Sequence, residues 1–145
     1  MIPVQYPEPD FQVRQEGGRQ VLFDRLRKKW VALTPEEWVR QNFVRFLVDV
    51  LGYPSPLVAV EKELRLGELT KRFDILVYKR EHRPWMMIEC KAMHVKLEDK
   101  VLDQLLRYHI SIPVEYLVVT NGGEAWAWQK RDGALTLLSR FPDFP

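Results

Sequence analysis

The stretch "LVAVEKELRLGELTKRFDILVYKREHRPWMMIECKA", residues 57–92, decides the fold of this 145-residue chain. It contains three runs of strand-forming residues, at 57–66, 71–80 and 84–92, separated by a Gly-Glu pair and by the polar "REHRP". Short apolar runs bounded by turn residues are typical of strands. We therefore predict three consecutive strands joined by short turns.

A helix is predicted immediately before these strands, over residues 34–51. Thr34 suits the N-cap, Pro35 suits the first helical position, and Glu37 completes a capping box with the threonine. Apolar residues then recur every three or four positions. Gly52 is expected to end the helix.

A second helix at 97–110 and a buried strand at 114–120 are predicted after the three strands. The order helix, three strands, helix, strand favours an α/β sandwich around a mixed central sheet flanked by helices. We expect this core to span about 34–122.

The two ends of the chain are expected to add smaller elements to the core. Residues 1–33 predict an extended arm followed by a hairpin around Gly17-Gly18. Residues 123–145 predict a final hairpin and a tail. A length of 145 residues favours a single domain, 1–145.

Composition argues against several classes of protein. An apolar fraction of 46% and an aromatic fraction of 12% argue against a disordered chain. No stretch approaches a membrane span, and the N-terminus lacks a signal-peptide pattern, so we expect a cytoplasmic protein without a membrane partner. Cys90 is the single cysteine, which excludes an internal disulfide.

The net charge of +2 is compatible with nucleic-acid binding but does not indicate it. The basic segment "RLRKK" at 25–29 is interpreted as a solvated loop or strand edge.

Three acids interrupt the strand runs at positions that would tolerate apolar residues. Glu61 and Asp74 lie within the first two runs, and Glu89 follows the apolar "WMMI" of the third. Burial of an unpaired carboxylate costs several kcal/mol, against a total stability of about 5–15 kcal/mol. Each acid therefore needs a solvent-exposed position, a partner or a cation.

Two interpretations of these acids are open. Salt bridges from Glu89 to Lys91 and from Asp74 to Arg72 would place them on a solvated face. Alternatively, a hairpin between the second and third strands brings Asp74 and Glu89 together, and a divalent cation would relieve their repulsion. All-oxygen ligation suits Mg²⁺, with Mn²⁺ as a substitute, and the histidines lack zinc spacing. Lys91, on the same strand face as Glu89, would then orient and help to deprotonate an attacking water.

Asp74 followed by Glu89-Cys90-Lys91 resembles the signature of the PD-(D/E)xK nuclease superfamily, with Phe73 where the proline would stand. Gln104 and Tyr108, an i, i+4 pair, resemble the Q-x-x-x-Y element of RecB-type members. Over residues 20–125, six segments in order resemble the N-terminal nuclease domain of type I restriction enzyme R subunits. They are "RKKWVALTPEEWVRQNFVRFLVDVLGYP", "VEKEL", "RFDILVY", "IECKA", "DQLLRY" and "VVTNGG".

The resemblance implies a restriction-endonuclease-like αβββαβ core and a Mg²⁺-dependent nuclease that hydrolyses DNA phosphodiester bonds. It implies that Asp74 and Glu89 bind the metal together with the backbone carbonyl of Cys90. Lys91 would act on the attacking water.

Further residues receive supporting roles from the resemblance. Glu61 would be an auxiliary acid near the metal, and Gln104 and Tyr108 would position the strand being cut or the catalytic lysine. Glu37 corresponds to an acid that some relatives bring to the site, although its capping role also explains it. Arg40 would meet a phosphate, with a surface arginine as the plainer interpretation.

Type I R subunits continue into a helicase motor, whereas this chain ends at Pro145, so we expect a stand-alone copy. A helicase or specificity partner acting in trans is compatible with this expectation, as is a homodimer, which is common among small nucleases. Two alternatives to a nuclease stay open. One is a catalytically inactive module that binds nucleic acid or a protein partner. The other is a structural dimer with solvated acids and an interface at Trp126 and Trp128.

Overall fold

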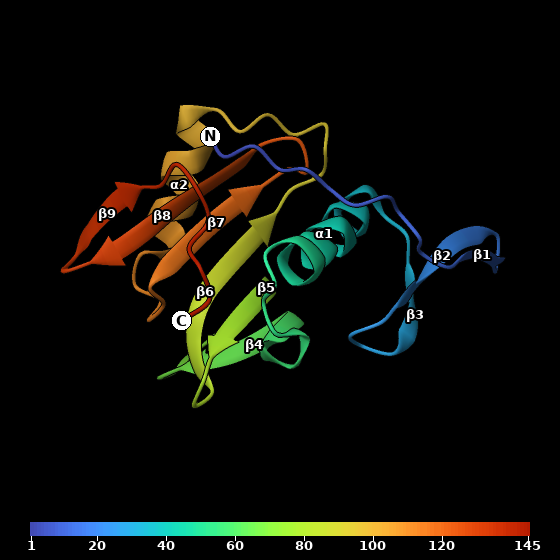
Figure 1. Cartoon of the computed structure of the whole chain (residues 1–145), viewed down its shortest axis with the longest axis horizontal. Coiled ribbons are helices and arrows are strands. Elements are labelled where there is room, and N and C mark those ends of the chain that lie inside the picture. Colours follow the sequence, from blue (N-terminus) through green and yellow to red (C-terminus); the bar gives the residue numbers. More distant parts are fainter.

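The computed structural model describes all residues, Met1–Pro145 (Figure 1). The chain forms two α-helices, α1 (Pro35–Arg45) and α2 (Asp99–His109). It also forms nine strands, a π-helical turn (Phe46–Val50) and a 3-10 turn (Ser55–Leu57). The strands are β1 (Val13–Glu16), β2 (Arg19–Asp24), β3 (Lys29–Ala32), β4 (Val58–Leu66), β5 (Leu69–Lys79), β6 (Arg83–Cys90), β7 (Tyr116–Thr120), β8 (Ala125–Arg131) and β9 (Ala134–Leu137). Neither helix is long and apolar enough to cross a membrane.

The main sheet has six strands in the order β4-β5-β6-β7-β8-β9. All neighbours are antiparallel except β6 and β7, which are parallel. A parallel pair needs a crossover, and the segment that contains α2 supplies it. The predicted α/β architecture with a mixed sheet is therefore confirmed.

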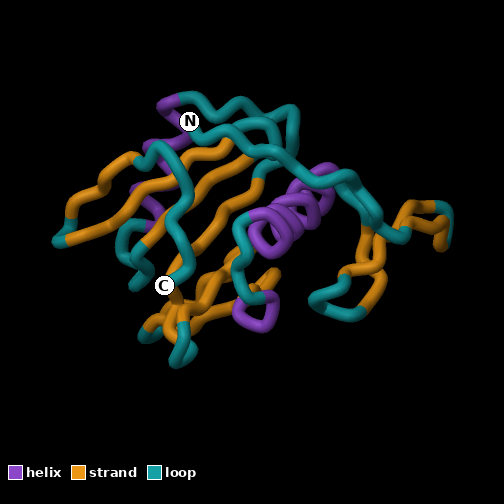
Figure 2. The backbone as a smooth tube through the Cα atoms, viewed as in Figure 1, coloured by secondary structure: helices purple, strands orange, loops and turns teal.

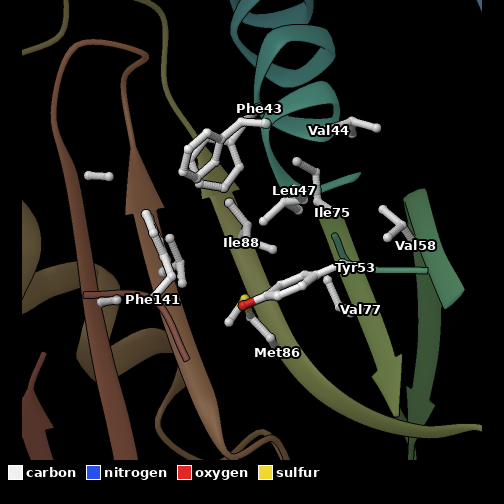
Figure 3. Close-up of a cluster of buried hydrophobic side chains, with 14 of the residues drawn as sticks. Phe43, Val44, Leu47, Tyr53, Val58, Ile75, Val77, Met86, Ile88 and Phe141 are labelled. Carbon is white, nitrogen blue, oxygen red and sulfur yellow. The ribbon is translucent and has the colours of Figure 1, made fainter. Parts of the chain in front are cut away.

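Helix α1 covers one face of the sheet and α2 covers the other (Figures 1 and 2). On the α1 side, Phe43 and Leu47 are fully buried against Ile75, Ile88 and other residues of the sheet (Figure 3). The C-terminal tail covers the same face, where Phe141 packs edge-on against Phe43.

The α2 side contains a separate apolar cluster. Trp128 is buried there with Leu97 and Leu102, and Trp126 packs against the same cluster. Both tryptophans therefore serve the packing of α2 on the sheet, which removes the basis for the interface suggested by their spacing.

The start of α1 agrees with the sequence in its cap but not in its capping box. The Glu37 N–H donates to Thr34 Oγ1 at 3.0 Å, so Thr34 is the N-cap. The Glu37 side chain, however, does not return to the cap backbone, because it is buried among polar groups of the protein. The helical segment ends before Gly52, whose φ of +74° suits glycine.

The N-terminal segment forms a separate three-stranded sheet in the order β1-β2-β3. The predicted hairpin is confirmed, with positive φ at both Gly17 and Gly18, as a two-residue hairpin turn requires. The sequence did not predict β3. The C-terminal hairpin, expected as a separate decoration, instead extends the main sheet through β8 and β9.

Removal of the α1 cap gives a first test of this fold. Thr34→Ala should lower the free energy of unfolding by about 1 kcal/mol, because the Glu37 N–H loses its acceptor. The measurement is urea unfolding followed by circular dichroism. Thr34→Ser is the matched control, since it keeps a hydroxyl acceptor and should stay close to wild type. Equal losses in both variants would contradict the cap.

Candidate functional site

Asp74 and Glu89 lie at the same end of the β5–β6 ladder. The last paired residues there are Ile75 and Ile88, so the two acids are the next residues on each strand. Both line a small cavity of about 270 Å³. The Cys90 N–H donates to Asp74 Oδ2 at 2.8 Å, which fixes the orientation of that carboxylate. The predicted meeting of the two carboxylates in one pocket is therefore observed.

The Glu89 carboxylate is in an unfavourable environment for a negative charge. Burial, followed by the charge of Asp74, raises the pKa of Glu89 to about 7, although Lys91 opposes this rise. Lys91 Nζ lies 3.6 Å from Glu89 Oε1. Lys91 therefore points toward the acids and not away into solvent. Its partial exposure leaves the ammonium accessible to a substrate or water.

Arg40 contacts four carboxylates, and its interpretation as a surface residue is wrong. Its side chain is 6% exposed. The guanidinium lies 3.1 Å from Asp74, and it also pairs with Glu36 at 3.6 Å, Glu37 at 3.1 Å and Glu61 at 3.0 Å. Burial would lower the pKa of Arg40, but these carboxylates outweigh it and hold the pKa above its ordinary value. A permanent positive charge therefore lies beside Asp74.

Glu61 lies opposite Asp74 in the sheet, because the β4–β5 ladder pairs the residues on either side of them. Its φ of +50° is unusual for a residue other than glycine and costs about 1–3 kcal/mol. Burial alone would raise the pKa of Glu61, yet Arg40, Arg72 and Arg27 lower it. Arg72 pairs with Glu61 at 2.6 Å, and not with Asp74 as the salt-bridge interpretation required. Glu61 lines the same cavity as Asp74, as expected of an auxiliary acid.

Glu36 is the α1 acid that lines the cavity, a role that the sequence assigned to Glu37. Burial and the charge of Asp74 raise the pKa of Glu36. Glu37 instead is buried behind it, where Arg27 Nη2 lies 2.7 Å from its carboxylate and Gln41 donates to it at 3.2 Å. The two acids are neighbours in sequence, and only the rotation of α1 about its axis distinguishes them.

Arg27 contradicts the interpretation of "RLRKK" as a wholly solvated segment. Its guanidinium pairs with Asp24 and Glu37, and lies 3.4 Å from Glu61. Gln41 also donates to Asp24, at 3.0 Å. These contacts join the three-stranded sheet to α1 and to β4.

Gln104 and Tyr108 lie on the exposed face of α2, and neither forms a hydrogen bond with Asp74, Glu89 or Lys91. A role in positioning the lysine is therefore not supported by a contact. The residue of α2 that reaches the site is His109, one of the histidines whose spacing does not suit zinc. Its Nε2 lies 3.8 Å from Glu89 Oε2, and burial lowers its pKa to about 4, so the imidazole is neutral.

No three His, Cys, Asp or Glu side chains are grouped closely enough to hold a metal by themselves. Both oxygens of Asp74 already have partners in the protein, since Oδ1 accepts from Arg40 and Oδ2 accepts from the Cys90 N–H. Burial and the charge of Asp74 raise the pKa of Glu89, so Glu89 is the carboxylate that a divalent cation with oxygen ligands would neutralise.

The unfavourable environment of the ionised Glu89 carboxylate can be tested through its effect on the free energy of unfolding. The folded-state pKa of about 7 lies above the ordinary 4.5, so the folded protein prefers protonated Glu89, and this preference becomes a penalty as the pH rises through 7. Glu89→Gln should therefore raise the melting temperature by several degrees at pH 8, for a gain on the order of 3 kcal/mol. The gain should vanish near pH 4.5, where wild-type Glu89 is already protonated.

Differential scanning fluorimetry across this pH range is the measurement. Glu63→Gln on the exposed side of β4 is the matched control and should show no such gain. A lower melting temperature of Glu89→Gln at pH 8 would mean that the Glu89 carboxylate stabilises the fold.

Residues 35–145 match the family model described as the type I restriction enzyme R protein N terminus. No curated protein matches the chain. The matched segment covers most of the chain and includes Asp74 and Glu89, which line the cavity, and Lys91, which lies 3.6 Å from Glu89. This chain therefore belongs to the family of type I restriction enzyme R protein N-termini.

Proposed function

We propose that this chain is a Mg²⁺-dependent nuclease that hydrolyses DNA phosphodiester bonds at the cavity between Asp74 and Glu89. Membership of a restriction enzyme family supports a nuclease-related module. The element order α1, β4, β5, β6, α2, β7 supports a restriction-endonuclease-like αβββαβ core. The observation that carries the proposal is the pair of carboxylates in one cavity with Lys91 Nζ 3.6 Å from one of them.

Residues in and beside the cavity have separate roles in this proposal. Asp74 and Glu89 would hold the cation, together with the Cys90 carbonyl. When bound, the cation would stabilise the charge that develops on the scissile phosphate and would lower the pKa of the attacking water. Lys91 would hold that water through Nζ and orient it toward phosphorus. Arg40 is a positioning residue, because it holds Asp74 Oδ1 at 3.1 Å.

Glu36 is the further acid that we assign to this site. It lines the cavity, and about half of its side chain is exposed, so it can turn toward a bound cation without unfolding α1. Gln104 and Tyr108, on the exposed face of α2, would act only on the DNA strand being cut.

A second function, a nucleic-acid-binding module without chemistry, is favoured by one observation. Arg40 already supplies a positive charge at Asp74, so the site is partly neutralised by the protein's own guanidinium. In a module of this kind, Arg40 would take the place of the cation. DNA binding would then be the same with and without a chelator, and no cleavage would occur.

Metal binding should be visible without any cleavage assay. Mn²⁺ should raise the melting temperature of the wild-type protein at pH 8, because the cation binds only the folded arrangement of Asp74 and Glu89. Glu89→Gln should lose this rise, while Glu63→Gln should keep it. An equal rise in all three proteins would place the cation elsewhere.

Cleavage is the direct test of the proposal. Plasmid, linear duplex, single-stranded and branched DNA are incubated with Mg²⁺ or Mn²⁺ and analysed on gels. Lys91→Ala should lower the cleavage rate at least ~100-fold, the range expected for loss of proton-transfer assistance. Lys96→Ala is the matched control, since Lys96 is an exposed lysine of the following loop and should retain activity. No cutting by wild type, or undiminished cutting by Lys91→Ala, would remove the proposal.

A further inference from the structure

The three-stranded sheet lines a groove that leads to the candidate site. The groove has a volume of about 730 Å³ and runs between β3, the start of α1 and the loop after β6, with Lys29 and Trp30 on one side and His94 on the other. Its lining shares Glu36, Arg40 and Glu61 with the smaller cavity that holds Asp74 and Glu89. A substrate in this groove would therefore reach the site directly.

Positive charge is concentrated on this small sheet. Residues 13–32 contain six cationic and two acidic side chains, a net charge of +4. The whole chain carries +2, so the remaining residues sum to −2. An anionic polymer is attracted to the small sheet and repelled by the average of the rest of the chain.

Three of these cations are exposed and have no ion-pair partner: Arg19, Lys28 and Lys29. By contrast, Arg14, Arg25 and Arg27 each pair with a carboxylate. Lys28 and Lys29 are neighbours at the β2–β3 turn, and Lys29 lines the groove. Arg19 lies at the other end of β2, and its side chain starts from the opposite face of the sheet, because Lys29 pairs with Asp24, five residues further along that strand. Lys28 and Lys29 are therefore the two unpaired cations that can meet a phosphate backbone on the groove side.

The small sheet is also held in a defined position beside the site. Arg27, at its β2–β3 turn, lies 2.7 Å from Glu37 of α1 and 3.4 Å from Glu61 of β4. Figure 1 shows the sheet beyond α1, away from the main sheet. A substrate that binds to the groove side of this sheet, at Lys29, is therefore held beside α1 and the cavity.

We propose that the β1–β3 sheet is a wall of the substrate groove that binds the phosphate backbone of duplex DNA through Lys29 and its neighbour Lys28. This inference rests on the proposed nuclease function and adds the surface that holds the substrate. The sheet lies wholly before residue 35, where the family match begins, so it is a feature of this chain beyond the matched segment. The contacts are to phosphates, so the wall provides affinity without sequence preference.

The test is DNA binding in the presence of a chelator, measured by fluorescence anisotropy of a labelled duplex at several salt concentrations. The variant combines Lys28→Ala and Lys29→Ala. It should bind ~10-fold more weakly at low salt, and the slope of log affinity against log salt should fall by up to about 2, close to one for each lost phosphate contact.

The matched control removes the same charge elsewhere, through Arg80→Ala and Arg83→Ala. These two residues are exposed, and they lie at the β5–β6 turn, the opposite end of that ladder from Asp74 and Glu89. The control should keep most of the wild-type affinity and slope. A third variant, Lys28→Arg with Lys29→Arg, should restore binding, which separates loss of charge from loss of folding.

Equal losses in the two alanine variants would overturn the wall, because net charge alone would explain them. Unchanged binding in the β1–β3 variant would also overturn it and would leave these cations for an acidic protein surface. The assay needs no cleavage, so its failure is distinguishable from failure of the nuclease proposal. A protein that binds DNA through the wall yet never cuts would keep this inference and lose only the chemistry.

Discussion

The buried guanidinium of Arg40 is the interaction on which the rest of the site depends. It contacts carboxylates from α1, β4 and β5, and so it joins the helix to two neighbouring strands of the sheet. A buried arginine without partners would cost several kcal/mol, and the acids around it would repel one another without it. Its charge therefore permits several acids to gather under one helix. The same contact holds Asp74, whose other oxygen accepts from the Cys90 N–H.

Arg40 does not compensate all of the negative charge, and the remainder lies at Glu89. That carboxylate has Lys91 at 3.6 Å but no closer cation, and burial and Asp74 raise its pKa to about 7. His109 beside it contributes no charge at neutral pH, since burial lowers its pKa to about 4. The nuclease and the inactive module differ in what happens to this remaining charge. In the nuclease an added divalent ion would neutralise it, and in the inactive module Arg40 would be the only compensation and Glu89 would have no further cation.

Substrate binding and chemistry would take place on different sheets of this molecule. The acids lie on the main sheet, with Lys91 just after β6, while Lys28 and Lys29 lie on the small N-terminal sheet. Arg27 joins the two parts, because its guanidinium contacts Asp24 of β2, Glu37 of α1 and Glu61 of β4. A phosphate backbone bound at Lys28 and Lys29 would therefore run along the groove toward the cavity, where the cation would offset the repulsion between the scissile phosphate and the acids.

The sequence by itself determined the elements and the main pair of acids. Strand and helix periodicity, the Thr34 cap, the glycine turns and the placement of Asp74 and Glu89 on consecutive strands are local properties, set by backbone preference and by the alternation of side chains. The tertiary structure alone decided which residues of each helix lie at the cavity or beside Glu89. Glu36 and not Glu37, His109 and not Tyr108, and the burial of Arg27 and Arg40 all depend on how a helix or turn is rotated against the sheet. One residue rotates a helical side chain by about 100°, so neighbouring positions with the same chemistry point in different directions, and only long-range packing selects between them.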